Sequence, residues 1–329
     1  MRIVVLSGGV GGSRFIRGLL AATAPDDDIT VVANTADDLW LFGLRVCPDL
    51  DTVMYTLGDG IDSGRGWGRT QETWNAKEEL AAYGAPQAWF GLGDRDLATH
   101  LVRSDLLRSG AGLTEATDRL CRRWAPGTDL DRIRLLPMTE DEVETWISTT
   151  VDGQDVDLHF QEFWIRHQAS VPVHAVTQRG IETSRPAPGV QEAIAFADVV
   201  ILPPSNPIVS VGPILAVPGV REALRGGVAP VVGVSPIIDG GAVRGMADQL
   251  LAGLNVENSA AAVAELHGSR SGDGVLDGWL VDESDADLLP RITGAGISAR
   301  AVPLWMRDAA TTQRLAEDTL DLARGLVRG

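Results

Sequence analysis

The first twenty residues, MRIVVLSGGVGGSRFIRGLL, constrain the fold more than any other stretch of this chain. An apolar run at residues 3–6 has the length of a buried strand, and it stops at the glycine-rich segment of residues 7–12. A helical pattern of apolar residues follows over residues 13–22. A strand, a glycine-rich turn and a helix in this order direct backbone N–H groups at a phosphate. We expect these glycines to adopt positive φ and to let an anion approach the backbone. The alternative is a tight turn without a ligand.

The common phosphate-binding motifs require residues that this chain lacks, and their absence limits the classes of ligand that the turn can bind. In the dinucleotide fingerprint G-x-G-x-x-G, counted from Gly9 and Gly11, the third glycine would fall where the chain has Arg14. The second predicted strand, at residues 29–33, is followed by Asn34 instead of the acidic residue that binds an NAD ribose. No G-x-x-x-x-G-K-[ST] motif is present. The turn is therefore predicted to bind a phosphate, in neither a nicotinamide site nor a P-loop.

The composition excludes several classes of protein. Among 329 residues, 28 Lys and Arg against 45 Asp and Glu give a net charge of −17, which disfavours nucleic acid as a partner. No apolar run reaches the roughly 18 residues of a membrane span. The first residues lack a signal-peptide pattern, and the two cysteines fit no disulfide framework. We therefore expect a cytoplasmic protein that neither binds nucleic acid nor enters a membrane.

Apolar runs of strand length alternate with helical patterns, which predicts a Rossmann-like, doubly wound, mostly parallel α/β sheet. Strands are predicted at residues 2–6, 29–33, 88–90, 173–177, 199–202, 230–234 and 298–302. Helices are predicted at residues 13–22, 50–57, 71–82, 97–108, 113–124, 190–197, 244–254 and 308–326.

The whole chain, residues 1–329, is expected to form a single α/β domain. A mainly helical insertion at about 65–130 is predicted to cover the active-site end of the sheet. At about 145–163, two segments that alternate apolar and polar residues flank Asp152-Gly153, which predicts a β-hairpin.

The segment Asn-Thr-Ala-Asp-Asp follows the second predicted strand, at the carboxyl edge where open α/β sheets bind ligands. Asn34 and Thr35 are suited to hydrogen-bond a phosphate or a ribose. For Asp38, a ligand contact and simple N-capping of the next element are equally supported.

Three carboxylates lie close in the sequence around one predicted helix. Asp49 and Asp51 open it, and Asp62 follows its end. Carboxylates at a helix start are usually caps that complement the helix dipole. If these three converge, however, their oxygen atoms suit Mg²⁺, which binds one or two carboxylates together with substrate phosphates.

Two further polar clusters stand at predicted loop–helix junctions. In Leu-Gly-Asp-Arg-Asp-Leu-Ala-Thr-His, Asp94 is suited to cap a helix and Arg95 to pair with a phosphate or a carboxylate. The turn Pro-Pro-Ser-Asn-Pro follows a predicted strand, and its Ser205 and Asn206 offer a second wall for phosphates.

Hydrolytic triad chemistry has little support. The chain has no G-x-S-x-G or H-E-x-x-H motif, its five histidines are scattered, and His100 is interpreted as a surface or capping residue. The residues favour phosphoryl-group chemistry by positioning, assisted by a divalent metal.

Taken together, the segments LSGGVGG, ANTADDLW, CPDLDTVMY, LGDRDLATH and PPSNPIVSVGPIL resemble one family over most of the chain. The family comprises the transferases that complete the precursor of the deazaflavin coenzyme F-420. They are called 2-phospho-L-lactate transferase in archaea and phosphoenolpyruvate transferase in actinobacteria. LGDRDLATH and PSNP are the most specific segments. The chain departs at RGWG, residues 65–68, where two adjacent tryptophans are expected.

The resemblance implies a reaction. The donor is a guanosine diphosphate derivative that carries enolpyruvate or lactate on its outer phosphate. The acceptor is the terminal ribityl hydroxyl of Fo, an 8-hydroxy-5-deazariboflavin. The hydroxyl attacks the outer phosphorus, GMP leaves, and Mg²⁺ shields the charge.

The resemblance also implies roles for the site residues. Asp49, Asp51 and Asp62 are expected to bind Mg²⁺ and to orient or deprotonate the Fo hydroxyl. The Fo side is expected to include Asp62, Asp94, Arg95 and Asp96. The GDP moiety is expected to bind Gly8, Gly9, Val10, Gly11, Gly12, Asn34, Thr35, Ser205 and Asn206.

Two rival interpretations and two open points remain at this stage. A regulatory protein of similar fold that binds nucleotide sugars without transferase activity is the main rival. A nicotinamide oxidoreductase is disfavoured by Arg14 and Asn34. The residues do not decide between enolpyruvyl and lactyl donors, although the arginine-rich, lysine-poor composition leans towards an actinobacterial chain and hence enolpyruvate. The family suggests a homodimer.

Overall fold

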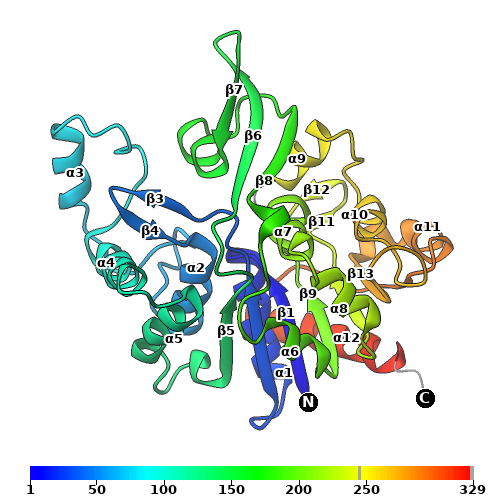
Figure 1. Ribbon diagram of the computed structural model, residues 1–329. Helices are drawn as coiled ribbons and strands as arrows, with labels where there is room; N and C mark the ends of the chain where they lie inside the picture. Colours follow the sequence, from blue (N-terminus) through cyan, green and yellow to red (C-terminus); the bar gives the residue numbers. More distant parts are fainter. Residues whose placement is uncertain (244–245, 327–329) are drawn as a thin grey trace.

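A seven-stranded sheet forms the centre of the molecule (Figure 1). The structure is a computed structural model that describes residues 1–243 and 246–326. The strand order of the sheet is β14-β13-β10-β9-β1-β2-β5, and every neighbouring pair is parallel. The predicted doubly wound α/β fold is thereby confirmed. The strands are β1 (Arg2–Ser7), β2 (Asp28–Ala33), β5 (Ile133–Pro137), β9 (Val199–Leu202), β10 (Val231–Val234), β13 (Gly278–Val281) and β14 (Ser298–Ala301). The strand order reverses between β1 and β9, where such sheets bind ligands beyond their carboxyl ends.

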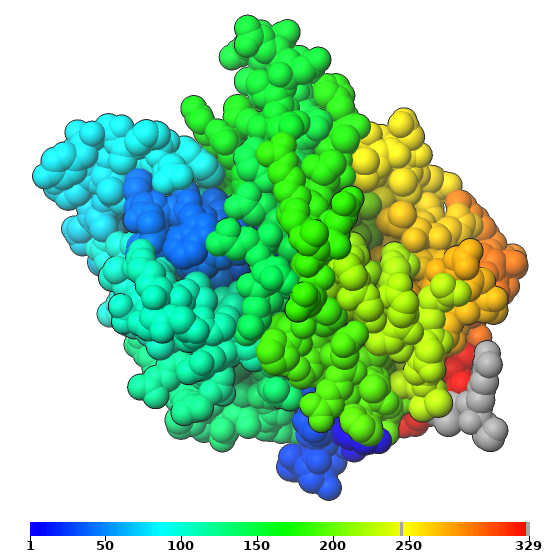
Figure 2. Space-filling view, in the orientation of Figure 1, coloured from blue at the N-terminus to red at the C-terminus, as the bar shows by residue number. Residues whose placement is uncertain are grey.

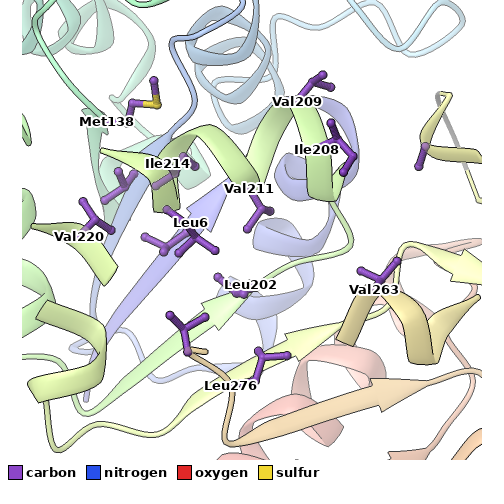
Figure 3. Packing of buried hydrophobic residues seen from close by; sticks show 14 of the residues in the cluster. Leu6, Met138, Leu202, Ile208, Val209, Val211, Ile214, Val220, Val263 and Leu276 are labelled. Carbon is purple, nitrogen blue, oxygen red and sulfur yellow. The ribbon is translucent and has the colours of Figure 1, made fainter. Parts of the chain in front are cut away.

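Helices cover both faces of this sheet because the strands are apolar on both sides. Along β1, Ile3 and Val5 face one layer, whereas Val4 and Leu6 face the other. The first layer contains α1 (Val10–Ala22), α2 (Pro48–Leu57), α5 (Leu113–Trp124) and α12 (Ala309–Leu326). The second contains α6 (Val190–Ala195), η4 (Pro207–Val211), α7 (Gly212–Ala216), α8 (Val220–Gly226), α10 (Ala260–His267) and α11 (Leu289–Gly294). Figure 3 shows Leu6 and Leu202 of the sheet packed near Val211 and Ile214 in this second core.

A largely helical region lies between β2 and β5, at one side of the carboxyl edge (Figure 1). It contains the hairpin β3 (Leu39–Leu41) and β4 (Leu44–Val46), then α2, α3 (Asn75–Ala82), α4 (Asp94–Arg108), α5 and η1 (Asp129–Arg132). α3 has no buried residue, so its packing contributes little to the fold. The buried residues of α4, by contrast, are Thr99, His100, Arg103 and Ser104, all polar. Buried polar side chains of this kind need hydrogen-bond or ion-pair partners, and the candidate active site described below provides them.

A separate three-stranded antiparallel sheet rises above the central sheet. Its strands are β6 (Glu144–Val151), β7 (Gln154–His159) and β8 (Ala175–Arg179), in the order β7-β6-β8. Asp152 and Gly153 connect β6 to β7 with positive φ at both residues, as a tight two-residue hairpin turn requires. Figure 2 shows this sheet, in green, projecting between the helical region in cyan and the C-terminal half in yellow and orange.

The remaining elements are short. They are η2 (Glu162–Arg166) after β7, η3 (Ile181–Thr183), β11 (Ile237–Ile238), β12 (Gly241–Ala242), α9 (Ala247–Gly253) and η5 (Glu283–Leu288).

Several sequence-based assignments of secondary structure are wrong. Residues 88–90 form a turn, because Phe90 packs beneath the β3–β4 hairpin instead of entering the sheet. The strand predicted at residues 173–177 is β8, which pairs antiparallel with β6 outside the central sheet. β5 and β13 were not predicted at all. The helix predicted from residue 244 begins at Ala247, and residues 244–245 lie outside the described part of the chain.

Within residues 1–243 and 246–326, no single helix has both the length and the hydropathy of a membrane span. One bent pair, Pro207–Ala216 with Val220–Gly226, meets these criteria jointly by length and composition.

Candidate active site

A cavity of about 640 Å³ lies at the carboxyl edge of the central sheet, where the strand order reverses. One wall comes from the β1–α1 turn and the start of α2, and a second from the helical region, including Trp67, Asp96 and His100. Phe160, Gln161 and Trp164 beside η2 contribute a third wall. The turns after β9 and β10, with residues 304–306, complete the enclosure. The cavity therefore joins segments from nearly the whole chain.

The glycine turn packs closely against its neighbours. None of its four glycines has a positive φ, so the expectation of left-handed backbone is wrong. A Cβ on Gly9 would lie 2.6 Å from Asp49 Oδ1, and one on Gly12 would lie 1.8 Å from Ser7 Oγ. The Gly8 N–H donates to Ser205 Oγ at 3.2 Å. Gly9 lies against α2, and a Cβ on Gly11 would lie 2.4 Å from the Pro204 carbonyl oxygen, so these two positions leave no room for a side chain.

The same turn still presents a helix start to the cavity. α1 begins at Val10, and both Val10 and Gly11 line the cavity. The first N–H groups of a helix have no intrahelical partner, and the helix dipole favours negative charge there. Ser205 and Asn206 line the opposite side. Asn206 caps η4 by accepting from the Ile208 N–H at 2.9 Å.

Asn34 and Thr35 lie behind this wall and do not line the cavity. The Asn34 amide donates to Asp49 Oδ2 at 3.0 Å and to the Val209 carbonyl at 3.1 Å. Its Oδ1 accepts from the Ala36 N–H. Since all of these atoms are engaged, Asn34 positions Asp49 in this structure.

Asp37 and Asp49 face the same cavity from two different elements. Asp37 is 4% exposed, and its Oδ1 has no hydrogen-bond partner among the described residues. Burial raises the pKa of Asp49 to about 6, against the hydrogen bonds from Asn34 and Gly9. Burial, followed by the charges of Asp49 and Asp38, raises the pKa of Asp37 well above its ordinary value. The two negative charges oppose each other's ionisation, which is the repulsion that a bound cation would relieve.

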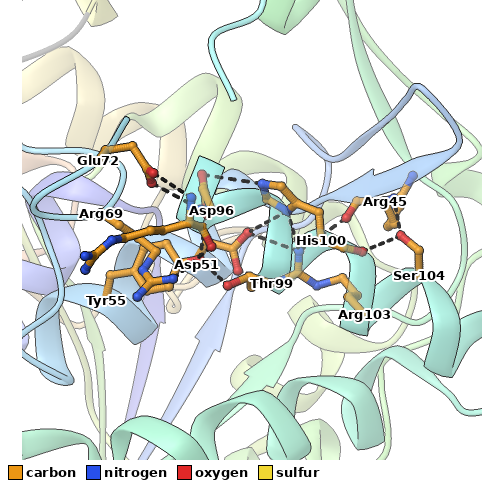
Figure 4. A network of polar contacts seen from close by, with 11 residues as sticks. Arg45, Asp51, Tyr55, Arg69, Glu72, Asp96, Thr99, His100, Arg103 and Ser104 are labelled. Carbon is orange, nitrogen blue, oxygen red and sulfur yellow. Dashed lines mark hydrogen bonds and ion pairs between the residues drawn. The ribbon is translucent and has the colours of Figure 1, made fainter. Parts of the chain in front are cut away.

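Asp51 belongs to a different arrangement, a buried polar network between α2 and α4 (Figure 4). Arg103 forms a two-pronged ion pair with it, with 3.1 Å between Arg103 Nη1 and Asp51 Oδ2. His100 lies between two carboxylates, with Nδ1 3.7 Å from Asp51 Oδ2 and Nε2 3.4 Å from Asp96 Oδ2. The Tyr55 hydroxyl donates to Asp96 Oδ1 at 2.6 Å.

This network favours the charged form of Asp96. Although burial opposes ionisation, His100 and the Tyr55 hydrogen bond lower the pKa of Asp96 below its ordinary value. Asp51, Tyr55, Asp96 and His100 all line the cavity, whereas Arg103 lies behind them. The interpretation of His100 as a surface or capping residue is therefore wrong, because it is 1% exposed and connects two acids.

The other predicted residues lie outside the cavity lining. Asp62 accepts from the Gly64 and Arg65 N–H groups, both at 3.0 Å, and these bonds lower its pKa. Asp94 holds the segment before α3, and hydrogen bonds led by that of Thr73 lower its pKa to about 2. Arg95 is also absent from the lining.

The predicted convergence of Asp49, Asp51 and Asp62 is accordingly not present. In the part of the chain that the structure describes, no group of three or more His, Cys, Asp or Glu side chains is placed to hold a metal ion. Two carboxylates, such as Asp37 and Asp49, are what Mg²⁺ needs when phosphate oxygens complete its coordination.

Sequence reasoning missed Asp37, Gln161 and the tryptophans of the cavity. Asp37 stands beside Asp38, to which attention went instead. Asp38 is fully buried 3.7 Å from Arg45 and does not line the cavity. The signal for Asp37 was its place in the segment that follows β2, at the carboxyl edge of the sheet. Gln161 and Trp164 carried no comparable signal, because their position depends on how the antiparallel sheet folds back.

A second cavity of about 450 Å³ lies at the other end of β13, lined by Arg221, His267 and the loop at residues 268–274. It is remote from the carboxyl edge, and its lining includes Glu265 and Asp273.

A parallel sheet with a helix start, two buried carboxylates and a cavity at its switch point is the arrangement typical of ligand-binding α/β proteins. The chain belongs to the family of 2-phospho-L-lactate transferase CofD, whose model matches residues 3–296. It is therefore a transferase.

Relatives and a solved structure agree with this assignment. The chain is 58% identical over 323 residues to the phosphoenolpyruvate transferase of Streptomyces coelicolor, covering 98% of each chain. It is 51% identical to that of Mycolicibacterium smegmatis, covering 98% of this chain and 99% of the relative. A crystal structure of a Bacillus halodurans protein has a TM-score of 0.64 at 18% identity, covering 97% of this chain and 99% of that one. This last likeness concerns the fold alone.

Proposed function

We propose that this transferase moves a phosphoenolpyruvyl group, or its 2-phospho-L-lactyl counterpart, from a guanosine diphosphate-linked donor to the terminal ribityl hydroxyl of Fo. GMP is released, and the product is the precursor of coenzyme F-420. The observation that carries the proposal is that a helix start, two buried carboxylates and aromatic walls all line the same cavity. The first feature suits a diphosphate, and the last suits a planar ring. The printed names of the relatives, phosphoenolpyruvate transferases, favour the enolpyruvyl donor.

We assign the GDP moiety to the glycine turn, Ser205 and Asn206. Val10 and Gly11 offer N–H groups at the start of α1, and these bind phosphate oxygens well because the helix dipole adds to the hydrogen bonds. Asn34 and Thr35 support this wall from behind rather than through direct contact.

Asp37 and Asp49 fit a Mg²⁺ ion, because the first has a buried oxygen without a partner and the second lies in the same cavity. Bound there, Mg²⁺ would shield the negative charge of the donor phosphates. The ion pair with the buried Arg103 fixes the position of Asp51, which suits it to orient the acceptor hydroxyl. Asp62 lies in a turn, Asp94 and Arg95 begin α4, and none of them lines the cavity, so the proposed contacts with Fo require that turn and the start of α4 to move.

The chemical step needs little from the protein beyond alignment. The acceptor oxygen forms a bond to the outer phosphorus, the bond from that phosphorus to the GMP oxygen breaks, and the hydroxyl proton passes to a cavity carboxylate, Asp49 or Asp51. Holding donor and acceptor in line provides most of the acceleration. The apolar walls exclude water that would otherwise hydrolyse the donor.

The test is a direct assay of the purified protein with Mg²⁺, Fo and each donor separately, followed by mass spectrometry of the product. We expect the dehydro product from the enolpyruvyl donor, two hydrogens lighter than the lactyl product. A protein that forms neither product but is stabilised by nucleotide sugars would contradict the proposal. The homodimer stays a prediction from the family resemblance, and light scattering of the purified protein checks it.

A further inference from the structure

We infer that Gln161 recognises the –CO–NH– edge of a planar heterocycle bound in the candidate active-site cavity. The inference rests on the proposed function and names a residue that selects one of its substrates.

The side chain of Gln161 is buried but unengaged. Gln161 follows β7, is 6% exposed and lines the cavity. Its backbone N–H donates to His159 Nδ1 at 3.1 Å, whereas its side-chain amide forms no hydrogen bond with another described residue and its polar atoms reach the cavity. Buried amides are nearly always hydrogen-bonded, because leaving one without a partner costs free energy. An amide that faces a cavity in this condition points to a ligand group.

The surroundings of Gln161 favour a flat ring. Phe160, Trp164 and Ile165 line the cavity next to it, and Trp164 is 40% exposed. Aromatic walls hold planar heterocycles by stacking, and a single polar group among them fixes the orientation. A primary amide presents an acceptor oxygen beside a donor NH2 group. This pair is complementary to a ring edge in which a carbonyl adjoins an N–H.

Two rings in the proposed reaction carry such an edge: the pyrimidinedione of Fo and the guanine of the donor. The position of Gln161 favours Fo. His159, two residues earlier, lies close enough to Glu144 and Arg45 for the charges of both to act on its imidazole. Arg45 is in turn joined through its backbone N–H to Ser104 of α4. Gln161 therefore lies on the side of the helical region, where Asp96 and His100 line the cavity.

The experiment compares wild-type protein with Gln161→Leu, which keeps the shape but removes both polar groups, and Gln161→Glu, which keeps acceptors and removes the donor. The control is Gln154→Leu, at an exposed glutamine of the preceding strand β7 that lies outside the cavity. Equilibrium dialysis gives the Kd for Fo, calorimetry gives the Kd for GDP, and thermal melting verifies folding. We expect Gln161→Leu to weaken Fo binding by about 10- to 100-fold, with a smaller loss for Gln161→Glu. The Kd for GDP should change by less than about twofold.

The outcomes separate this inference from the proposed function. Loss of GDP binding alone would keep the recognition of a –CO–NH– edge and assign it to guanine. Unchanged Kd values for both ligands in folded Gln161→Leu and Gln161→Glu proteins would overturn the inference while leaving the proposed function intact. A wild-type protein that binds neither Fo nor GDP would refute the proposed function itself.

Discussion

Arg14 is a positive charge in an otherwise acidic cavity. It lies four residues after Val10 on α1, so the two share one helix face, and both line the cavity. Arg65, the other arginine in the described lining, pairs with Asp62 at 3.0 Å and lies 5.3 Å from the Trp67 ring centroid. Arg14 forms no ion pair with a described residue, although four aspartates share its cavity. Arg14 is therefore placed to pair with the anionic donor that we propose.

We expect Arg14→Ala to raise the KM for the donor by about tenfold or more, because a charge-assisted hydrogen bond contributes about 1.5–3 kcal/mol. Steady-state kinetics at saturating Fo measures it. Arg17→Ala is the matched control, since Arg17 lies on the same helix but binds Asp59 outside the cavity. Equal KM values for Arg14→Ala and wild type would remove Arg14 from the donor site.

The proposed metal ligands are separable by single substitutions. Asp37→Asn should weaken Mg²⁺ binding in the presence of GDP by about tenfold or more, because it removes a carboxylate that faces Asp49. Calorimetry measures the Kd. Asp38→Asn, at the neighbouring buried carboxylate outside the lining, should leave that Kd unchanged.

Asp62→Ala tests the role that the family resemblance gives to Asp62. If Asp62 binds Mg²⁺ or Fo after a loop movement, its replacement lowers turnover and alters the Mg²⁺ dependence of the rate. Near wild-type turnover with an unchanged Mg²⁺ titration would show that Asp62 only caps its turn, as its bonds to Gly64 and Arg65 suggest.

Sequence reasoning found residues whose place follows from strand topology. Asp49 opens a helix at the carboxyl edge, and Ser205 follows a strand there; both line the cavity. It did not find Gln161 or the burial of His100. Those positions depend on long-range packing of the antiparallel sheet and of α4, which local periodicity does not encode.

At the scale of elements, the buried Arg103–Asp51 pair attaches α4 to α2. Arg103 is 1% exposed, and its Nη1 also donates to the Arg45 carbonyl at 3.3 Å. Despite the cost of burial, Asp51 raises the pKa of Arg103 above its ordinary value. α4 has polar residues on its buried face, so this network, rather than apolar packing, fixes it against α2.

Arg103→Met should therefore destabilise the protein by about 3–5 kcal/mol, since it leaves the Asp51 carboxylate buried without a counter-charge. Urea unfolding measures the change. The double variant Asp51→Asn with Arg103→Met removes both charges and should recover part of the loss. A single variant as stable as wild type, or a double variant without recovery, would contradict this view of the pair.

The errors in secondary structure also have physical causes. Residues 88–90 are too short an apolar run to distinguish a strand from a turn that packs against a hairpin. β13 has only four residues and follows a loop rich in glycine, serine and aspartate, so its strand signal is weak. The glycine turn was found correctly, but its glycines serve close packing rather than positive φ.

At the scale of the whole molecule, buried acids and a buried histidine make the free energy of unfolding depend on pH in opposite directions. Burial raises the pKa of Asp38 to about 7 and of Asp49 to about 6, so the native state retains protons that the unfolded chain loses above about pH 4. These two acids therefore raise the free energy of unfolding as the pH falls. Burial, aided by Arg221, lowers the pKa of His267 to about 4, which has the reverse effect.

The direction in which His267 changes the free energy of unfolding with pH follows from proton uptake. Between about pH 4 and 6.5 the unfolded chain binds a proton at His267 that the native state, with its lower pKa, does not bind. Its contribution is fully present above pH 6.5 and is lost as pH falls, by up to about 3 kcal/mol near pH 4. His267→Gln should therefore be most destabilising, relative to wild type, at neutral pH, and the difference should shrink as pH drops. Urea unfolding at pH 4 to 7 gives both curves, with His174→Gln, at an exposed histidine, as control. Because the acids are common to both proteins, they cancel in the difference, and a difference that is constant with pH would mean that His267 titrates alike in the folded and unfolded states.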